Sequence, residues 1–269
     1  MTDAGSLWDV DRVADFKRNP TYERRVVVFY DMLGWRSEID SAGSDPTKIG
    51  NLRRLILSHT RVLRMPTGRP VNVSTFSDNV VISTSIDQDA IPHFLLSIAA
   101  MQLMTASLHF LVRGGITVGD IYHDSESVFG PGLNRAYELE SKVAVVPRIV
   151  IDKDVIDIRR IEGFYAFEDG LYFLDPFTSQ FMQFWLDNSS DRDLRGNKFS
   201  DAGVPSSGRL PPVPGYVGLQ VILDGLKKRI RSPLSDEKYS KVAWLFDRTA
   251  KRLGQPNSSS YPRTRPSDI

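Results

Sequence analysis

Two aspartates are the residues of this 269-residue chain whose surroundings are best suited to chemistry. Asp31 lies within FYDMLGW and Asp78 within FSDN, each where a run typical of a β-strand gives way to a tight turn. A carboxylate there can bind a hard cation, and the amides that follow Asp31 can face phosphate oxygens. Two such carboxylates on neighbouring strands would repel each other unless a cation lay between them. The pair therefore predicts a site for two divalent metal ions and a nucleoside triphosphate, although either aspartate alone could simply stabilise its turn.

Hydrophobic patterns predict the elements that would position these two residues. Residues 24–30 (RRVVVFY) are typical of a central strand, and a helical region follows that ends before Pro66. Residues 71–85 predict two strands joined as a hairpin, with Asp78 at its tip. Both aspartates would then lie at neighbouring strand ends.

The second half of this region begins with an uncharged segment, residues 91–112. It contains a proline, a glutamine and two histidines, so it predicts a helix buried against a sheet rather than a membrane span. Residues 114–122 and 148–151 are typical of strands, and residues 133–143 of a helix between them. The resulting β-α-β-β-α-β-α-β order predicts an α+β fold with a ferredoxin-like core, in which an antiparallel sheet carries helices packed on one face.

Composition and patterning divide the chain into four parts. These are an N-terminal segment (1–23), the main domain (24–175), a helical extension (176–253) with a flexible insertion (188–215), and a disordered tail (254–269). In the extension, residues 216–231 and 235–253 are typical of two amphipathic helices. The main domain would hold the two aspartates, and the extension would be a C-terminal helical appendage.

The bulk composition excludes several classes of function. A net charge of +1 gives no general reason to expect nucleic-acid binding. The absence of cysteine excludes disulfides, thiolate catalysis and cysteine-ligated zinc. The N-terminal residues show no apolar run of the kind found in signal peptides. We therefore expect a cytoplasmic protein without nucleic-acid or membrane partners.

A third candidate for chemistry lies at the start of the helix expected after a Gly-Pro-Gly turn, within FGPGLNRAYELE. Asn134 follows this turn directly, so its side chain could cap the helix. In a nucleotide site the same amide could orient a ribose. The sequence around Asn134 fits either role.

Together, these motifs resemble those of class III nucleotidyl cyclases. FYDMLGW resembles their metal-binding strand F-x-D-[IM]-x-G-[FW], and FSDN resembles their second metal aspartate on a hairpin. RGGITVGDIYH and VFGPGLNRAYELES resemble their R-x-G-I-x-x-G strand and N-x-A-x-x-L-E helix, and are more similar still to the pyrimidine cyclases of Pycsar anti-phage defence. The resemblance covers about residues 24–151, and its specificity comes from four motifs in the right order.

The resemblance implies a metal site and a set of nucleotide contacts. Asp31 and Asp78 would bind two divalent ions, Mn²⁺ or Mg²⁺, with the Met32 carbonyl as a further ligand. Asn134 would act on the ribose as a catalytic residue. The remaining nucleotide contacts implied are the Phe29 side chain and the amides of Leu33, Gly34 and Trp35. In this family the parts of one site come from two protomers, so we expect a head-to-tail homodimer with sites at the interface.

The positions that read the base in the family are occupied here by Ser74 and Ser127, counted from Asp78 and Asn134. Neither the Lys/Asp pair of adenylyl cyclases nor the Glu/Cys-type pair of guanylyl cyclases is present. A serine hydroxyl can donate or accept a hydrogen bond, so these residues disfavour the usual purine patterns without identifying a pyrimidine.

One position departs from the family pattern. The arginine expected four residues after the asparagine is Glu138 here. Arg135 is the replacement that we expect to act in catalysis, and Arg113, Lys142 or a residue of the C-terminal extension are further candidates. Loss of such a charge donor typically lowers the rate by about 100- to 1000-fold, which is compatible with a slow enzyme or with binding alone.

The sequence and the resemblance together favour a uridylate cyclase. It would convert UTP into 3′,5′-cyclic UMP and pyrophosphate, and the product would signal phage infection to a separate effector protein. Three alternatives stay open: a cytidylate cyclase acting on CTP, a purine cyclase with an altered base pocket, and a catalytically silent nucleotide-binding module.

Overall fold

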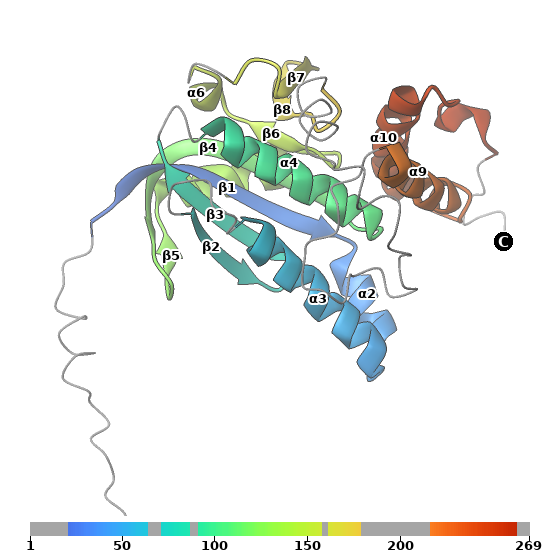
Figure 1. Cartoon of the computed structure of the whole chain (residues 1–269), viewed down its shortest axis with the longest axis horizontal. Helices are drawn as coiled ribbons and strands as arrows, with labels where there is room; N and C mark the ends of the chain where they lie inside the picture. The colour runs from blue at the N-terminus through green and yellow to red at the C-terminus, as the bar shows by residue number, and fades with distance from the viewer. Residues whose placement is uncertain (1–20, 64–70, 87–90, 158–160, 179–215, 263–269) are drawn as a thin grey trace, which may run out of the picture.

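A single sheet organises the chain in the computed structural model, which describes residues 21–63, 71–86, 91–157, 161–178 and 216–262. Within these residues the strands lie in the order β2-β3-β1-β4-β6-β8-β7, with β5 paired to β4 (Figure 1). The strands are β1 (Glu23–Leu33), β2 (Val71–Phe76), β3 (Asn79–Ser85), β4 (Leu111–His123), β5 (Val128–Phe129), β6 (Ile149–Ile151), β7 (Tyr165–Glu168) and β8 (Leu171–Leu174).

The central strand is β1, as its run of β-branched and aromatic residues predicts. It pairs antiparallel with β3 on one side, with Tyr30 opposite Val80, and with β4 on the other, with Asp31 opposite Arg113. Strands β2 and β3 form the predicted hairpin, with Ser77 in the left-handed conformation at its tip, φ 57°. The two motifs that contain aspartate therefore lie at the same end of neighbouring strands.

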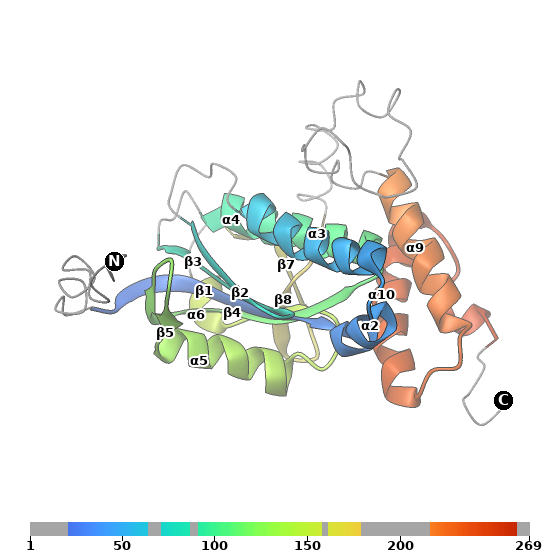
Figure 2. The same ribbon diagram turned by 90° about the horizontal axis from the view of Figure 1, so that it is seen from below.

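Helices cover both faces of this sheet (Figure 2). On one face lie α3 (Pro46–Leu63) and α4 (Ile91–Ser107), which pack on Val28 and Tyr30. On the other lies α5 (Pro131–Glu138), which packs through Ala136 on Val27 and Phe29. Successive side chains of a strand point to opposite faces, so β1 contributes to both layers. The shorter helical elements of this region are α2 (Trp35–Ala42), the π-helical turn η1 (Leu139–Val143) and α6 (Lys153–Ile156).

The expected α+β fold is confirmed, including the ferredoxin-like order β2-β3-β1-β4 with all three pairings antiparallel. Two features extend that core. Strand β6 pairs parallel with β4, which makes the sheet mixed. Helix α5 packs on the face opposite α3 and α4, so one face of the core is covered by the two ferredoxin-type helices and the other by α5.

The uncharged segment at residues 91–112 contains helix α4 and the start of β4. His109, in the left-handed conformation with φ 69°, lies in the turn between them. Most α4 side chains are buried, as expected for a helix packed against a sheet and a second layer. Among the described helices, none is long and apolar enough to cross a membrane.

The helical extension is confirmed as a pair of helices, α9 (Tyr216–Ile230) and α10 (Asp236–Leu253). Ser235 caps α10 by accepting a hydrogen bond from the Lys238 amide. An apolar cluster joins the pair to α4 and the start of β4, where Leu103 and Leu111 are buried. Arg248 of α10 adds ion pairs to the β7–β8 region. The extension therefore packs against the end of the sheet at which β1 finishes (Figure 2).

Part of the tail that we expected to be disordered is ordered. Residues 254–262 contain a short 3-10 helix, η2 (Ser258–Ser260), and the amide and hydroxyl of Ser258 donate to the carboxylate of Asp247. Tyr261 packs edge to face on Phe246. The polar composition of the tail predicted disorder, but one aromatic and one buried serine attach it to α10. The insertion at residues 188–215 and most of the N-terminal segment lie outside the described residues.

Candidate active site

Strand β1 and the β2–β3 hairpin bring the two aspartates together. Asp31 lies two positions after Phe29, so both side chains point to the face that α5 covers. Asp78 lies in the hairpin turn, with its carboxyl within hydrogen-bonding reach of that of Asp31. Burial, followed by this contact and the charge of Asp78, raises the pKa of Asp31 to about 7. Two carboxyls that share one proton could hold a divalent cation in its place.

An arginine and a buried glutamate accompany the aspartate pair. Arg113 lies opposite Asp31 on β4, with its Nη2 4.0 Å from Asp31 Oδ2. Its Nε donates to Glu140 Oε1 at 2.6 Å, and the Glu140 side chain is only 4% exposed. Burial raises the pKa of Glu140, while the charge of Arg113 opposes that shift. The guanidinium is therefore anchored to η1 and neutralises part of the negative charge around Asp31.

The turn after β1 offers amide donors next to the aspartates. Gly34 adopts a left-handed conformation, φ 88°, which glycine tolerates without strain, and it directly precedes α2. Among the described residues no side chain caps the start of α2, and the first amides of a helix have no acceptor within it. Trp35 is buried, with its ring centroid 5.8 Å from that of Phe110, and this packing fixes the position of the turn. This turn is suited to binding an anion.

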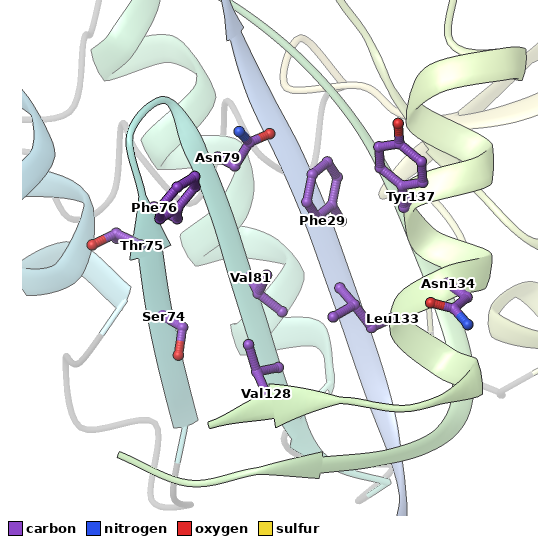
Figure 3. A pocket seen from close by; sticks show the side chains of 10 residues that line it. All are labelled: Phe29, Ser74, Thr75, Phe76, Asn79, Val81, Val128, Leu133, Asn134 and Tyr137. Carbon is purple, nitrogen blue, oxygen red and sulfur yellow. The ribbon is translucent and has the colours of Figure 1, made fainter. Parts of the chain in front are cut away.

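A pocket of about 410 Å³ has in its lining Asn79, which follows Asp78 in the chain, and Phe29, which lies two residues before Asp31 (Figure 3). It brings together three of the predicted nucleotide-contacting residues: Phe29 from β1, Ser74 from β2 and Asn134 from α5. The Phe29 ring meets Tyr137 edge to face at 5.4 Å between centroids. Among the described residues, no charged side chain lines the pocket. The other lining residues are Thr75, Phe76, Asn79, Val81, Val128 and Leu133.

The remaining predicted site residues lie elsewhere. Ser127 is exposed in the β4–β5 turn, where its amide donates to Asp124 Oδ1 at 2.7 Å, and it does not line the pocket. Arg135 points to Asp152, with hydrogen bonds of 2.8 and 3.0 Å, and so is committed to the start of α6. Leu33 packs on the C-terminal apolar cluster, and the Met32 side chain is buried in the core.

Two parts of the site did not emerge from the sequence. The first is the ion pair between Arg113 and Glu140, which joins β4 to η1. The second is a contact of His123 with Ser74 and Ser83, because the β4–β5 hairpin brings the end of β4 to β2 and β3. The spacing of the four histidines resembles no ligand motif, so it gives no indication of this contact. The polar residues at 72, 74, 83 and 123 were the available signal, but they can be related to one another only once the strand pairing is known.

The aspartate pair fits a bound divalent metal. Its two carboxyls are close enough to share a proton, and hard cations prefer carboxylate oxygen. Within the described part of the chain, no group of three or more histidine, cysteine, aspartate or glutamate residues could hold a metal ion. A cation at this place would therefore depend on two protein carboxylates, with the rest of its ligands from backbone, water or substrate.

Comparison with known proteins gives only distant similarities. No family model and no curated protein matches the chain. Among solved structures, the adenylyl cyclase CyaB from P. aeruginosa is 14% identical with a TM-score of 0.44, over 58% of this chain and 96% of that one. The guanylyl cyclase domain of the RhoGC fusion protein from Blastocladiella emersonii is 19% identical with a TM-score of 0.46, over 58% and 96%.

A third solved structure, a class III adenylyl cyclase-like ATP-binding protein from Pseudomonas aeruginosa, is 9% identical with a TM-score of 0.40, over 51% of this chain and 34% of that one. Similarities this distant carry no argument about what the present chain binds or does. The functional interpretation therefore depends on the site itself and on the motifs that form it.

Proposed function

We propose that this protein is a nucleotidyl cyclase that converts UTP into 3′,5′-cyclic UMP and pyrophosphate. The observation that supports this most is the closeness of the Asp78 carboxyl to that of Asp31, which together with burial raises the pKa of Asp31. A turn that needed only one capping aspartate would not place a second carboxyl against it, at the cost of raising the pKa of Asp31 to about 7. Two carboxylates that bind divalent cations together must lie close to each other.

The proposal assigns residues of this chain to the metal ions, the triphosphate and the ribose. In cyclisation the ribose 3′ oxygen bonds to the α-phosphorus, the bond from that phosphorus to the bridging oxygen breaks, pyrophosphate leaves and the hydroxyl proton passes to solvent. Asp31 and Asp78 would hold two divalent ions, Mn²⁺ or Mg²⁺, with the Met32 carbonyl. Such ions supply charge stabilisation for the attacking and leaving oxygens. The amides from Leu33 to Trp35 would bind the triphosphate.

The pocket would hold the nucleoside. Phe29 would pack on it, Asn134 would orient the ribose, and Ser74 would contact the base. The uncharged lining supports a base reader different from the charged pairs of purine cyclases. Ser127 could contribute only if the β4–β5 turn moved or if a second copy of the chain completed the pocket, because it is exposed outside the lining.

A homodimer with the pocket at its interface is part of this proposal. Phe76 is 82% exposed and Tyr137 is 52% exposed at the rim of the pocket. Large apolar side chains clustered in this way commonly mark an interaction surface. In a head-to-tail pair, Asn134 of one copy would face Asp31 of the other. The product would then act on a separate effector in defence against phage, as the Pycsar resemblance implies.

A second candidate is a nucleotide-binding module without turnover. Two observations favour it: Glu138 occupies the position of the family arginine, and Arg135 donates to Asp152. If neither residue changes partner on binding substrate, Arg113 remains as a cation 4.0 Å from Asp31, but it is paired with Glu140. Binding would then occur with little catalysis.

Incubation of the purified protein with each of the four nucleoside triphosphates and Mn²⁺, followed by mass spectrometry, separates these candidates. Cyclic UMP supports the proposal, cyclic CMP or a cyclic purine nucleotide redirects it, and binding without product supports the silent module. Asp31→Asn and Asp78→Asn should abolish turnover, whereas Asp120→Asn, an exposed aspartate on β4, should not. Full activity in either of the first two variants would overturn the metal assignment.

The dimeric site has its own test. Asp31→Asn and Asn134→Ala are each expected to be inactive, but a mixture of the two should regain part of the activity. A mixed dimer contains one site with both native residues only if these residues come from different copies. Absence of recovery, with mixed dimers present, would place both residues of each site in the same copy.

A further inference from the structure

A buried histidine connects the pocket to the interior of the sheet. His123 ends β4, which lies beside the ends of β2 and β3 (Figure 1). Its Nε2 is 3.0 Å from Ser74 Oγ at the pocket wall, and its Nδ1 is 2.9 Å from Ser83 Oγ inside the sheet. The Asn72 side chain donates to the His123 carbonyl and fixes the end of β4 against β2. One imidazole therefore bridges two hydroxyls.

The ring is neutral at physiological pH. Burial, together with the nearby charge of Arg25, lowers the pKa of His123 to about 4. A neutral imidazole has one N–H donor and one acceptor nitrogen. One of the two serines must therefore donate its proton to the ring, and the other must accept a proton from it.

Burial decides which serine donates. Ser83 is 0% exposed, and among the described residues its hydroxyl has the His123 ring as its partner. If Ser83 accepted from Nδ1–H, its own proton would be buried without an acceptor, which is costly. Ser83 therefore donates to Nδ1, and the proton of the ring lies on Nε2. From there it is donated to Ser74 Oγ.

Ser74 is left with a free proton. Its side chain is partly exposed and lines the pocket (Figure 3), so its O–H can turn toward a bound ligand while its oxygen accepts from the ring. Without this contact the serine could either donate or accept. With it, the pocket presents a hydrogen-bond donor at this position.

We propose that His123 is a positioning residue that makes Ser74 a hydrogen-bond donor toward the base, so that the pocket selects a carbonyl oxygen over an amino group. This inference rests on the proposed function and names the specificity of the same site. Uracil carries a carbonyl oxygen at the position where cytosine carries an amino group, and guanine differs from adenine in the same way. A donating Ser74 therefore favours UTP over CTP.

The first test is binding, which requires no turnover. Dissociation constants of the α,β-methylene analogues of UTP and CTP are measured by calorimetry with Mg²⁺. The wild-type protein should prefer the UTP analogue, and Ser83→Ala should reduce that preference by about tenfold, because the ring then has no donor on Nδ1 that fixes its proton on Nε2. Ser85→Ala, on the same strand and face, is the matched control and should retain the preference.

The second test separates positioning from a general structural effect. If Ser83 acts through Ser74, Ser83→Ala should have no further effect on the preference in a Ser74→Ala background. An additional loss of preference in that background would overturn the inference. So would an unchanged preference in the Ser83→Ala single variant, or a wild-type preference for the CTP analogue.

Nitrogen NMR of the wild-type protein tests the proton position directly. The chain has four histidines, and the resonances of His123 are identified by their loss in His123→Gln. We expect Nε2 to be protonated and Nδ1 to be an acceptor; protonation on Nδ1 would overturn the inference. Failure of the proposed function has a different signature, namely no cyclic product from any nucleoside triphosphate, whatever the base preference in binding or the proton position.

Discussion

Replacing Asp31 by asparagine should stabilise the metal-free protein at high pH while it removes binding of divalent metals. The pKa of Asp31 is raised from 3.8 to about 7, first by burial and then by Asp78. Between these values the unfolded chain has already lost a proton that the folded protein still holds. Stability contributed by this group is therefore present at low pH and is lost as pH rises through that window. Asparagine carries no such charge.

The magnitude follows from the contacts of the carboxylate. Two unit charges about 4 Å apart repel by about 1 kcal/mol in water and by about 4 kcal/mol at an effective dielectric constant of about 20. The Asp31 side chain is 22% exposed, and Arg113 lies 4.0 Å away on the other side. Solvent screening and the positive charge of Arg113 reduce the net repulsion between Asp31 and Asp78 to the lower part of this range, about 1–2 kcal/mol. For a chain of this size, that gain raises Tm by about 2–6 °C.

Thermal unfolding of wild type and Asp31→Asn, followed by circular dichroism with EDTA, measures this effect. At about pH 8.5 the variant should be more stable, and at about pH 5.5 the two should be similar, because the amide can donate to Asp78 as the protonated acid does. Mn²⁺ should stabilise only the wild type. Asp120→Asn should behave as wild type under all conditions.

The reasoning would be refuted if Asp31→Asn were less stable than wild type at about pH 8.5 with EDTA. That result would mean that the ionised Asp31 carboxylate stabilises the metal-free protein, as expected for a residue that only stabilises its turn. A wild-type protein that gained no stability from Mn²⁺ would also refute it, because the pair would then have no function as a metal site.

Three further predictions concern other parts of the chain. A Cβ at Gly225 of α9 would collide with the His109 ring, so Gly225→Ala should lower the free energy of unfolding by about 1–3 kcal/mol in urea. Gly50→Ala, with open space around Gly50 in α3, should be neutral or stabilising, and equal effects of the two variants would contradict the packing of α9. Burial lowers the pKa of His59 to about 4, so stability should fall by up to about 3 kcal/mol as pH drops from about 6.5 to 4, and His59→Gln should lack that dependence. Glu138→Arg restores the family arginine at a half-exposed position and should raise kcat by about tenfold or more; an unchanged kcat would show that this charge is not what limits the rate.

Local patterns of the sequence were enough to predict the elements that carry the aspartates. The β-branched run of residues 24–30 predicted the central strand, and the turn chemistry around Asp78 predicted the hairpin. The helix after the Gly-Pro-Gly turn and the two C-terminal helices were also found, because their periodicity and caps are local signals. The short strands β5, β7 and β8 were not assigned, whereas β6, of three residues, was.

The candidate site was predicted less completely. Phe29, Ser74 and Asn134, each expected to contact the nucleotide, line one pocket of a single chain, and the carboxyls of Asp31 and Asp78 lie close together. Arg135, expected to act in catalysis, instead binds Asp152. That pairing joins two elements separated along the chain and leaves no trace in the local sequence. Contacts between distant parts of the chain also explain why the order of residues 254–262 was not predicted. This order depends on contacts with α10 rather than on the composition of these residues.

By itself, the sequence determined which residues could do chemistry: two carboxylates near strand ends, a glycine turn, and an asparagine at a helix start. These are properties of residue type and of neighbours along the chain. Only the tertiary structure decided which side chain each of the charged and polar groups contacts. It placed the Asp31 carboxyl against Asp78, committed Arg113 to Glu140, and set His123 between two serines. Protonation and hydrogen-bond direction depend on burial and on distances between strands, and neither exists until the sheet has formed.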